Sequence, residues 1–203
     1  PPFPHSRHQH IPFVDPEIRV QVKLLQEVVD YNGSQLCSLY AYRTARIVGD
    51  CVIAFRGACD VEDDSMVDLE DRLAGATIAS SAMVHFLAEH FGEDLVRTVL
   101  RQRMFARLAA DLLAQRCGRA VRVAGDDLFI DQRKASISVA TVSPVSGLFH
   151  FAINLRTDRV PVPAIGLEEL GVEWKSYATD LLDRYRDETT DISQAAAKVR
   201  WVR

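Results

Sequence analysis

The sequence has no long hydrophobic run and no strong excess of charge of either sign. No apolar segment approaches the roughly 18 residues that a membrane-spanning helix requires, so we expect no membrane domain. The first residues also lack the apolar stretch of a secretory signal peptide. Lys and Arg number 24 against 28 Asp and Glu, which gives a net charge of −4. This balance argues against a nucleic-acid binder that relies on bulk positive charge.

Cysteine is scarce, and its spacing excludes the common metal and redox motifs. The four cysteines, Cys37, Cys51, Cys59 and Cys117, form no C-x-x-C pair. A chain of 203 residues with 48% hydrophobic and 26% charged residues can bury a core without the help of disulfides. We therefore expect free thiols and a location in the reducing cytoplasm.

The first 18 residues differ in composition from the rest of the chain. They are rich in Pro and His and show no periodicity, which predicts an N-terminal arm, residues 1–18, followed by a single domain, residues 19–203. Three histidines of the arm are more typical of a polar segment than of a metal site, namely His5, His8 and His10.

The first half of the domain combines strands and helices. Alternation over residues 20–24 indicates a strand, and Ser34 is a suitable N-cap for a helix that ends near Gly49. The apolar run 51–55 indicates a buried strand, and the strongly acidic stretch 60–71 follows it. Apolar residues then recur at helical spacing, which predicts one helix over 79–91 and another over 95–117.

The second half of the domain changes to short strands and then returns to helices. An antiparallel meander is predicted over 121–123, 128–130, 137–140 and 148–153. Helices are predicted over 167–171 and 173–187 and after Asp191, with Trp174, Tyr177 and Leu181 facing the core. The whole order indicates an α+β fold, with a mixed sheet of about six strands and helices mainly on one side.

One segment of the meander carries a pattern with chemical meaning. Asp126 and Asp127 occupy a turn, and Lys134 opens the strand after the next turn. A hairpin can bring these residues into one cleft, where the lysine would neutralise a carboxylate or phosphate and the aspartates would hold Mg²⁺. The spacing alone is more typical of a hairpin whose polar ends are simply solvated.

This segment resembles the core of the biotin and lipoate protein ligase family. The matching residues are Asp126-Asp127-Leu128 and Lys134-Ala135-Ser136, and the segment from Phe149 to Leu155 is similar to the next strand of the family, which ends in Ile-Asn. Upstream, Gly33-Ser34 before a helix and the strand 51–55 running into Arg56-Gly57 follow the order of the family.

A closer resemblance is to an uncharacterised, largely archaeal family with the same fold. Its matching phrases begin at Tyr31, Ala54 and Gly125, and they span most of the chain after residue 20. This resemblance implies the fold and says little about the reaction.

The ligase resemblance implies a specific activity and a set of site residues. Such enzymes join a carboxylic acid to ATP as an acyl-adenylate and pass the acyl group to a lysine of an acceptor protein. Lys134 would stabilise the carboxylate and the α-phosphate, with Asp126 and Asp127 near Mg²⁺ or the nucleotide. The loop that closes over the acyl-adenylate would contain Arg56 and Gly57. Asn154 and His150 would belong to the substrate-binding strand, although His150 is as typical of a core histidine.

The sequence also departs from the ligase pattern. The arginine- and glycine-rich phosphate loop of the family is replaced by Arg56-Gly57-Ala58-Cys59 and the acidic stretch, and Asp126 stands where the ligases carry Asn. Acidic residues would repel phosphates unless Mg²⁺ offsets the charge. A non-catalytic binding protein with a degenerate phosphate loop therefore stays open as an alternative.

Two further enzymatic interpretations stay open. Relatives on this fold transfer acyl groups without ATP, some through a cysteine, and Cys59 after Arg56 is the candidate, although its position is more typical of a small buried thiol. A metal-dependent hydrolase would use the acidic stretch 60–71 together with His85 and Glu89. His85 and Glu89 share a face of the predicted helix, whereas His90 is turned by about 100°, and the pattern is more typical of a solvated helix face. No H-E-x-x-H motif supports the hydrolase. An exposed edge of the meander favours a homodimer.

Overall fold

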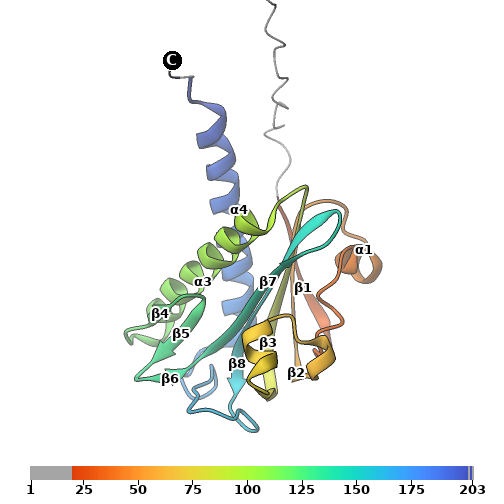
Figure 1. Ribbon diagram of the computed structural model, residues 1–203. Helices are drawn as coiled ribbons and strands as arrows, with labels where there is room; N and C mark the ends of the chain where they lie inside the picture. The colour runs from red at the N-terminus through yellow and green to blue at the C-terminus, as the bar shows by residue number, and fades with distance from the viewer. Residues whose placement is uncertain (1–19, 201, 203) are drawn as a thin grey trace, which may run out of the picture.

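The structure, a computed structural model, describes residues 20–200 and residue 202 (Figure 1). The predicted arm, with His5, His8 and His10, lies outside the described residues. The strands are β1 (Gln21–Val28), β2 (Cys51–Val61), β3 (Ile78–Phe91), β4 (Arg122–Ala124), β5 (Asp127–Ile130), β6 (Arg133–Lys134), β7 (Ser136–Val142) and β8 (Ser146–Arg156). The helices are α1 (Tyr40–Ala45), a 3₁₀ turn (Asp63–Ser65), α2 (Leu69–Leu73), α3 (Leu95–Cys117) and α4 (Trp174–Ala197).

A mixed five-stranded sheet forms the centre of the fold. Its strand order is β1-β2-β3-β8-β7, with β1 parallel to β2 and the other neighbours antiparallel. Strands β4, β5 and β6 form a second, three-stranded sheet. Helices α3 and α4 lie on one side of the main sheet (Figure 1). The predicted α+β class, with a mixed sheet and helices mainly on one side, is confirmed.

The central strands separate two kinds of side chain by alternation. On β8, Phe149 and Phe151 face α3 and α4 in the main core, whereas His150 and Asn154 point to the opposite face. The same alternation holds on β3, where Phe86 faces the helices and His85 does not. This arrangement gives the sheet a helix face and an opposite face, which we call the cavity face.

The prediction of a helix over 79–91 is wrong, because this segment is strand β3. Almost every residue of β3 after Ser81 is buried, since the strand is central and covered on both faces. A continuous apolar run of this kind has no clear period of two and imitates helical spacing. The adjoining helix over 95–117 is confirmed as α3, with Asp94 as its N-cap and Gly118 at its C-terminal end.

Other boundaries also differ from the predictions. The helix expected from Ser34 is only α1, because Ser34 donates to the side chain of Asn32 in a turn instead of capping a helix. Strand β2 runs to Val61, beyond the predicted 51–55. The meander is confirmed but is divided between the two sheets. The two predicted C-terminal helices after residue 173 form one helix, α4, and residues 167–171 form turns.

None of the helices between residues 20 and 200 is long and apolar enough to cross a membrane.

Candidate functional site

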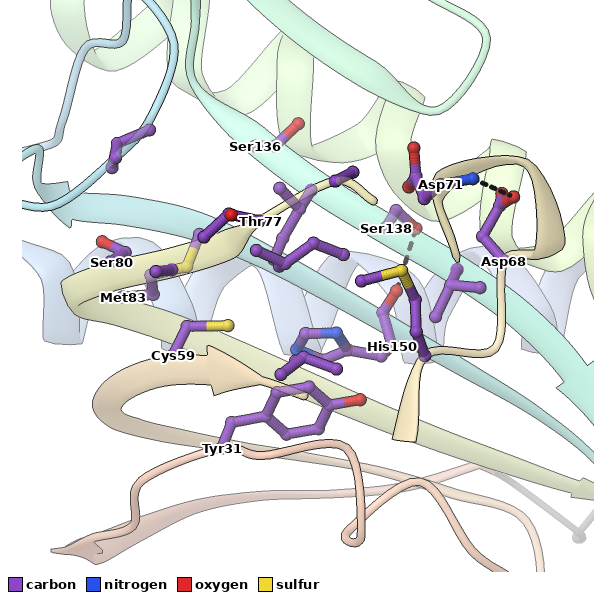
Figure 2. Close-up of a pocket in the computed structure, with 18 of the residues that line it drawn as sticks. Tyr31, Cys59, Asp68, Asp71, Thr77, Ser80, Met83, Ser136, Ser138 and His150 are labelled. Atoms are coloured by element: carbon purple, nitrogen blue, oxygen red, sulfur yellow. Dashed lines mark hydrogen bonds between the residues drawn. The ribbon is translucent and has the colours of Figure 1, made fainter. Parts of the chain in front are cut away.

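A cavity of about 380 Å³ opens on the cavity face of the main sheet. Its wall combines strand residues with the acidic segment between β2 and β3, and Figure 2 shows the side chains that project into it. Met83, Ile78 and Val139 supply apolar surface, while aspartates, a lysine and a histidine supply polar groups. A cavity of this size and mixed lining is typical of a small-molecule site.

The ion pair between Lys134 and Asp127 is the strongest electrostatic feature of the cavity. The lysine Nζ lies 2.8 Å from Asp127 Oδ2, and the two side chains are 30% and 29% exposed. Strand pairing brings the residues together, since Lys134 is opposite Phe129 in the β5–β6 hairpin. The backbone of Lys134 is also fixed, because its N–H donates to Pro163 O and its carbonyl accepts from Ile165 N–H.

The surroundings of Asp127 disfavour the charged form of its carboxyl group. Burial raises its pKa above the usual value, and the charges of Asp126 and Asp71 act in the same direction. The hydrogen bond and the charge of Lys134 oppose this shift. Lys134 thus faces a local excess of negative charge, of which Asp71 is contributed by α2 of the acidic segment.

Asp126 is held by a network that connects the hairpin to helix α3. Its Oδ2 accepts from Gln102 Nε2 at 2.7 Å, and its Oδ1 lies 3.5 Å from an Arg103 guanidinium nitrogen. The same Gln102 nitrogen donates to Ser138 Oγ at 2.8 Å. Gly125 has φ +69°, a backbone conformation that L side chains rarely adopt, so glycine permits this tight turn.

A stack of aromatic rings forms the inner wall of the cavity. The Tyr31 ring lies 3.9 Å from the His150 ring, centroid to centroid, and Figure 2 shows the two side by side. His150 Nε2 lies 3.1 Å from His85 Nδ1, and His85 Nε2 lies 3.4 Å from the carbonyl oxygen of Gly57. Burial lowers the pKa of His85 to about 4, and burial together with His85 holds the pKa of His150 well below its usual value.

The structure brings six of the sequence-predicted site residues to the cavity wall: Cys59, Asp126, Asp127, Lys134, His150 and Asn154. The role of Asn154 there is partly structural, because its side-chain amide donates to the carbonyls of Lys134 and Ile165. His150 both lines the cavity and is buried, so its two alternative descriptions are compatible.

Arg56 and Gly57 do not border this cavity. Arg56 points to the helix face, where its guanidinium carbon lies 5.4 Å from the Trp174 ring centroid. Gly57 packs against the backbone that follows β1, since a Cβ there would clash with the carbonyl oxygen of Val29. Both residues line a separate hollow with Asp30 and Glu168. The structure therefore does not place them beside Lys134.

Cys59 lines the cavity as a buried thiol. Its side chain is inaccessible to solvent, and burial followed by the charge of Asp60 raises its pKa to about 12. Arg56, the cation expected to activate it, faces the other side of the sheet. These features favour the neutral thiol over a nucleophilic thiolate. All four cysteines are free, as expected.

The residues of the hydrolase interpretation have structural partners. His85 and Glu89 share the cavity face of strand β3, but Glu89 accepts hydrogen bonds from Leu39 N–H and the Ser146 hydroxyl. His90 points to the helix face, where it contacts Tyr185 Oη at 2.8 Å. In the described part of the chain, no group of three or more His, Cys, Asp or Glu residues could hold a metal ion.

The predicted acid and nucleotide site did not include Tyr31, Asp68 or Asp71, all of which line the cavity. Asp68 is the N-cap of α2, where its side chain accepts from the backbone N–H groups of Glu70 and Asp71. Tyr31 is placed by a bridge to Cys59. The acidic composition of 60–71 was visible in the sequence, but its position over the cavity depends on long-range packing.

Comparisons with known proteins agree with the predicted family. Residues 20–200 match the family described as "Domain of unknown function (DUF366)". Uncharacterized protein MJ0805 of Methanocaldococcus jannaschii is 30% identical over 174 residues, 81% of this chain and 78% of that protein. The solved structure of a protein of unknown function from Pyrococcus horikoshi is 36% identical, with a TM-score of 0.87 over 91% of this chain and 100% of that chain.

More distant solved structures include ligases. A bi-partite lipoate protein ligase from Thermoplasma acidophilum is 15% identical, with a TM-score of 0.52 over 84% of this chain and 83% of that chain. A biotin protein ligase from Aquifex aeolicus, in complex with biotin and ATP, is 11% identical, with a TM-score of 0.54 over 84% and 70%. At these identities the likeness concerns the fold, and it confirms the biotin/lipoate protein ligase-like architecture.

Proposed function

The chain belongs to the family described as Domain of unknown function (DUF366), and we propose that it binds a small carboxylic acid and activates it with ATP and Mg²⁺. The observation that carries the proposal is the Lys134–Asp127 pair at the wall of a cavity of about 380 Å³. The biotin protein ligase that shares the fold is in complex with biotin and ATP, which supports the same class of reaction.

The role proposed for Lys134 follows from the charges of the cavity. Lys134 is the one Lys or Arg among its described lining residues, which also include Asp68, Asp71, Asp126 and Asp127. An incoming carboxylate is repelled by the aspartates and attracted by the lysine, so we expect its oxygens to lie toward the lysine. The fixed cation then stabilises negative charge as it develops on the acid.

The charges also determine which form of nucleotide the cavity fits. A free triphosphate would face four carboxylates with one lysine, whereas its magnesium complex brings compensating positive charge. Mg²⁺ commonly takes one or two protein carboxylates together with phosphate oxygens, and Asp71, Asp126 and Asp127 are the candidates. ATP, bound in this form, would supply the adenylyl group that activates the acid, with pyrophosphate as the leaving group.

Residues behind the cavity wall would hold the reacting groups in position. Gln102 and Arg103 fix Asp126, and the backbone bonds to Pro163 and Ile165 fix Lys134. An acceptor protein is proposed as the partner, as the bi-partite lipoate protein ligase has an E2 lipoyl domain. A homodimer through the edge strand β7 and a location in the cytoplasm stay predictions.

ATP–pyrophosphate exchange with pooled biotin, lipoate and medium-chain fatty acids tests the proposal. We expect acid-dependent exchange in the wild type and a loss of about 100-fold or more in Lys134→Ala, since the cation that stabilises developing charge is removed. Lys134→Arg keeps the charge and should retain part of the activity. Lys198→Ala, at the end of α4 and exposed, is the matched control and should be unchanged.

Exchange of equal rate in the wild type and Lys134→Ala would contradict the role of the lysine. Absence of exchange in the wild type, with acid binding retained, would favour the non-catalytic binding protein instead. Binding of the same acids is therefore measured by calorimetry in parallel.

A further inference from the structure

Two stacked histidines, His150 at the cavity wall and His85 behind it, form a series of hydrogen bonds with a fixed direction. The chain begins at Gly57, whose carbonyl oxygen can only accept, so His85 Nε2 must carry the proton at that end. A neutral His85 then has a bare Nδ1, which accepts from Nε2–H of His150. The geometry therefore assigns the Nε2–H tautomer to both rings.

This assignment leaves Nδ1 of His150 as an acceptor without a proton. His150 is 2% exposed, and Nδ1 has no hydrogen-bond partner among the residues that the structure describes. In the same part of the chain, no fully buried side-chain nitrogen or oxygen lacks a partner, so this atom must be reached from open space. His150 lines the cavity, which is the space available.

A second unpartnered group lies beside it. The Tyr31 ring is stacked on His150, and its hydroxyl makes no hydrogen bond to another residue between 20 and 200. Since no fully buried side-chain oxygen in that range lacks a partner, this hydroxyl is also open to the cavity. A hydroxyl both donates and accepts, whereas His150 Nδ1 only accepts. The inner wall of the cavity thus offers one acceptor, His150 Nδ1, and one group that can donate or accept, the Tyr31 hydroxyl. Both lie away from Lys134, because His150 pairs with Val139 inside the main sheet and Lys134 precedes strand β7.

We infer that His150 Nδ1 accepts a hydrogen bond from the ligand, so that the acid carries a neutral N–H or O–H donor on its acyl chain. This inference rests on the proposed function, which places the carboxylate at Lys134. A plain alkyl chain would bury Nδ1 without a partner, and a buried unsatisfied acceptor reduces affinity more than a missing contact does.

The charge state of the pair favours a neutral donor over an anion. Both histidines stay neutral near pH 7, because burial lowers their pKa values. A second carboxylate at this end of the ligand would meet two ring faces and a tyrosine without a compensating cation. Amide, urea and hydroxyl groups all satisfy the requirement, and they define the ligand class.

Three medium-chain acids that differ only in their terminal group test the inference. One ends in hydroxyl, one in methoxy and one in methyl, and their binding to the full chain is measured by isothermal titration calorimetry. Only the hydroxyl can donate to Nδ1, so we expect it to bind about tenfold or more tightly than the other two. In His150→Phe, which keeps a planar ring for Tyr31, this preference should disappear.

His85 acts as a positioning residue, and its role has a spectroscopic signature. In wild-type protein, ¹⁵N NMR of the imidazoles should show a proton on Nε2 of both rings and an unprotonated Nδ1 on His150. The hydroxyl acid should shift the Nδ1 resonance of His150, and the methyl acid should not. In His85→Phe the His150 tautomer is no longer fixed, so we expect the preference to fall without being abolished.

Failure of the inference and failure of the proposed function give different results. Equal binding of the three acids by wild-type protein, with a further loss for all of them in Lys134→Ala, would overturn the inference and leave the acid site in place. Failure of all three to bind would overturn the acid site and the inference with it. A proton on Nδ1 of His150 in the ¹⁵N NMR spectrum of the free wild-type protein would also overturn the inference. This test requires no variant, so it does not depend on whether a variant folds.

Discussion

The two faces of the central sheet use the same strands for different purposes. On the helix face, Phe86, Phe149 and Phe151 pack against Phe105 of α3, with ring centroids between 5.1 and 6.2 Å apart in the contacts they make. On the cavity face, neighbouring positions carry His85 and His150, which are hydrogen-bonded to each other, and His150 borders the cavity. Alternation along a strand therefore separates the residues that hold the fold from those available to a ligand.

The division of the sheet into a helix face and a cavity face also explains where the two cations lie. Arg56 belongs to the helix face and contacts Trp174 of α4, whereas Lys134 belongs to the cavity wall. Successive side chains of a strand point to opposite faces of the sheet. Arg56 therefore lies outside the cavity, although the resemblance predicted it in the loop that closes over the ligand.

Truncation of the helix face should produce the largest loss of stability. Phe151→Ala removes a side chain with no solvent exposure from between Phe86 and Phe105. We expect a loss of about 3–5 kcal/mol in the free energy of unfolding, measured by urea denaturation. His150→Phe, one residue away on the cavity face, should cost less than about 2 kcal/mol. Equal losses in both variants would contradict the division between the faces.

Acidic pH should act mainly through the cavity face. The pKa of His85 is about 4 in the folded protein, below its usual value, and that of His150 is also lowered, so the unfolded chain binds more protons below about pH 6.5. Stability is therefore full at neutral pH and falls as the pH drops, by at most about 1.4 kcal/mol per pH unit for each histidine.

The double variant His85→Phe/His150→Phe serves as the comparison for this effect. It should lose less stability than the wild type between pH 6.5 and 4.5, as measured by chemical denaturation at a series of pH values. His90, which pairs with Asp50, and Asp30, whose charge acts on His85, are present in both proteins. Their contributions to the pH dependence of stability therefore cancel when the two proteins are compared. Parallel pH profiles would show that the pair titrates normally.

Removal of Arg56 should have a small effect. Arg56→Ala breaks the contact with Trp174, and we expect a loss of about 0.5–1 kcal/mol by thermal or urea denaturation. Trp174→Leu should make the Arg56 substitution nearly neutral, since the two side chains act as a pair. A loss above about 2 kcal/mol would indicate that Arg56 has buried partners that the contact with Trp174 does not explain.

Local sequence signals were sufficient for the hairpin and for α3. The β5–β6 turn is short, so Asp127 and Lys134 meet through backbone pairing that their spacing already indicates. Helix α3 is delimited by Asp94 and Gly118, residues with known capping roles. The resemblance carried by the hairpin segment, and not by α3, pointed to the ligase-like fold that the structure has.

Three features could not be predicted from local sequence because they depend on long-range packing. Strand β3 is buried on both faces, so its apolar residues lost the alternation that would have marked it as a strand. The stack of Tyr31 on His150 joins residues more than a hundred positions apart, and no local pattern announces it. The face of Arg56 likewise depends on the order of strands in the sheet, which local periodicity does not specify.

We propose that acid activation depends on the cation of the cavity face, Lys134, and not on the cation of the helix face, Arg56. Acid-dependent ATP–pyrophosphate exchange, measured side by side in Lys134→Ala and Arg56→Ala, tests this directly. We expect exchange to be lost in Lys134→Ala and to stay within about twofold of the wild type in Arg56→Ala. Exchange that survives in Lys134→Ala but is lost in Arg56→Ala would contradict it and move the site to the other face of the sheet.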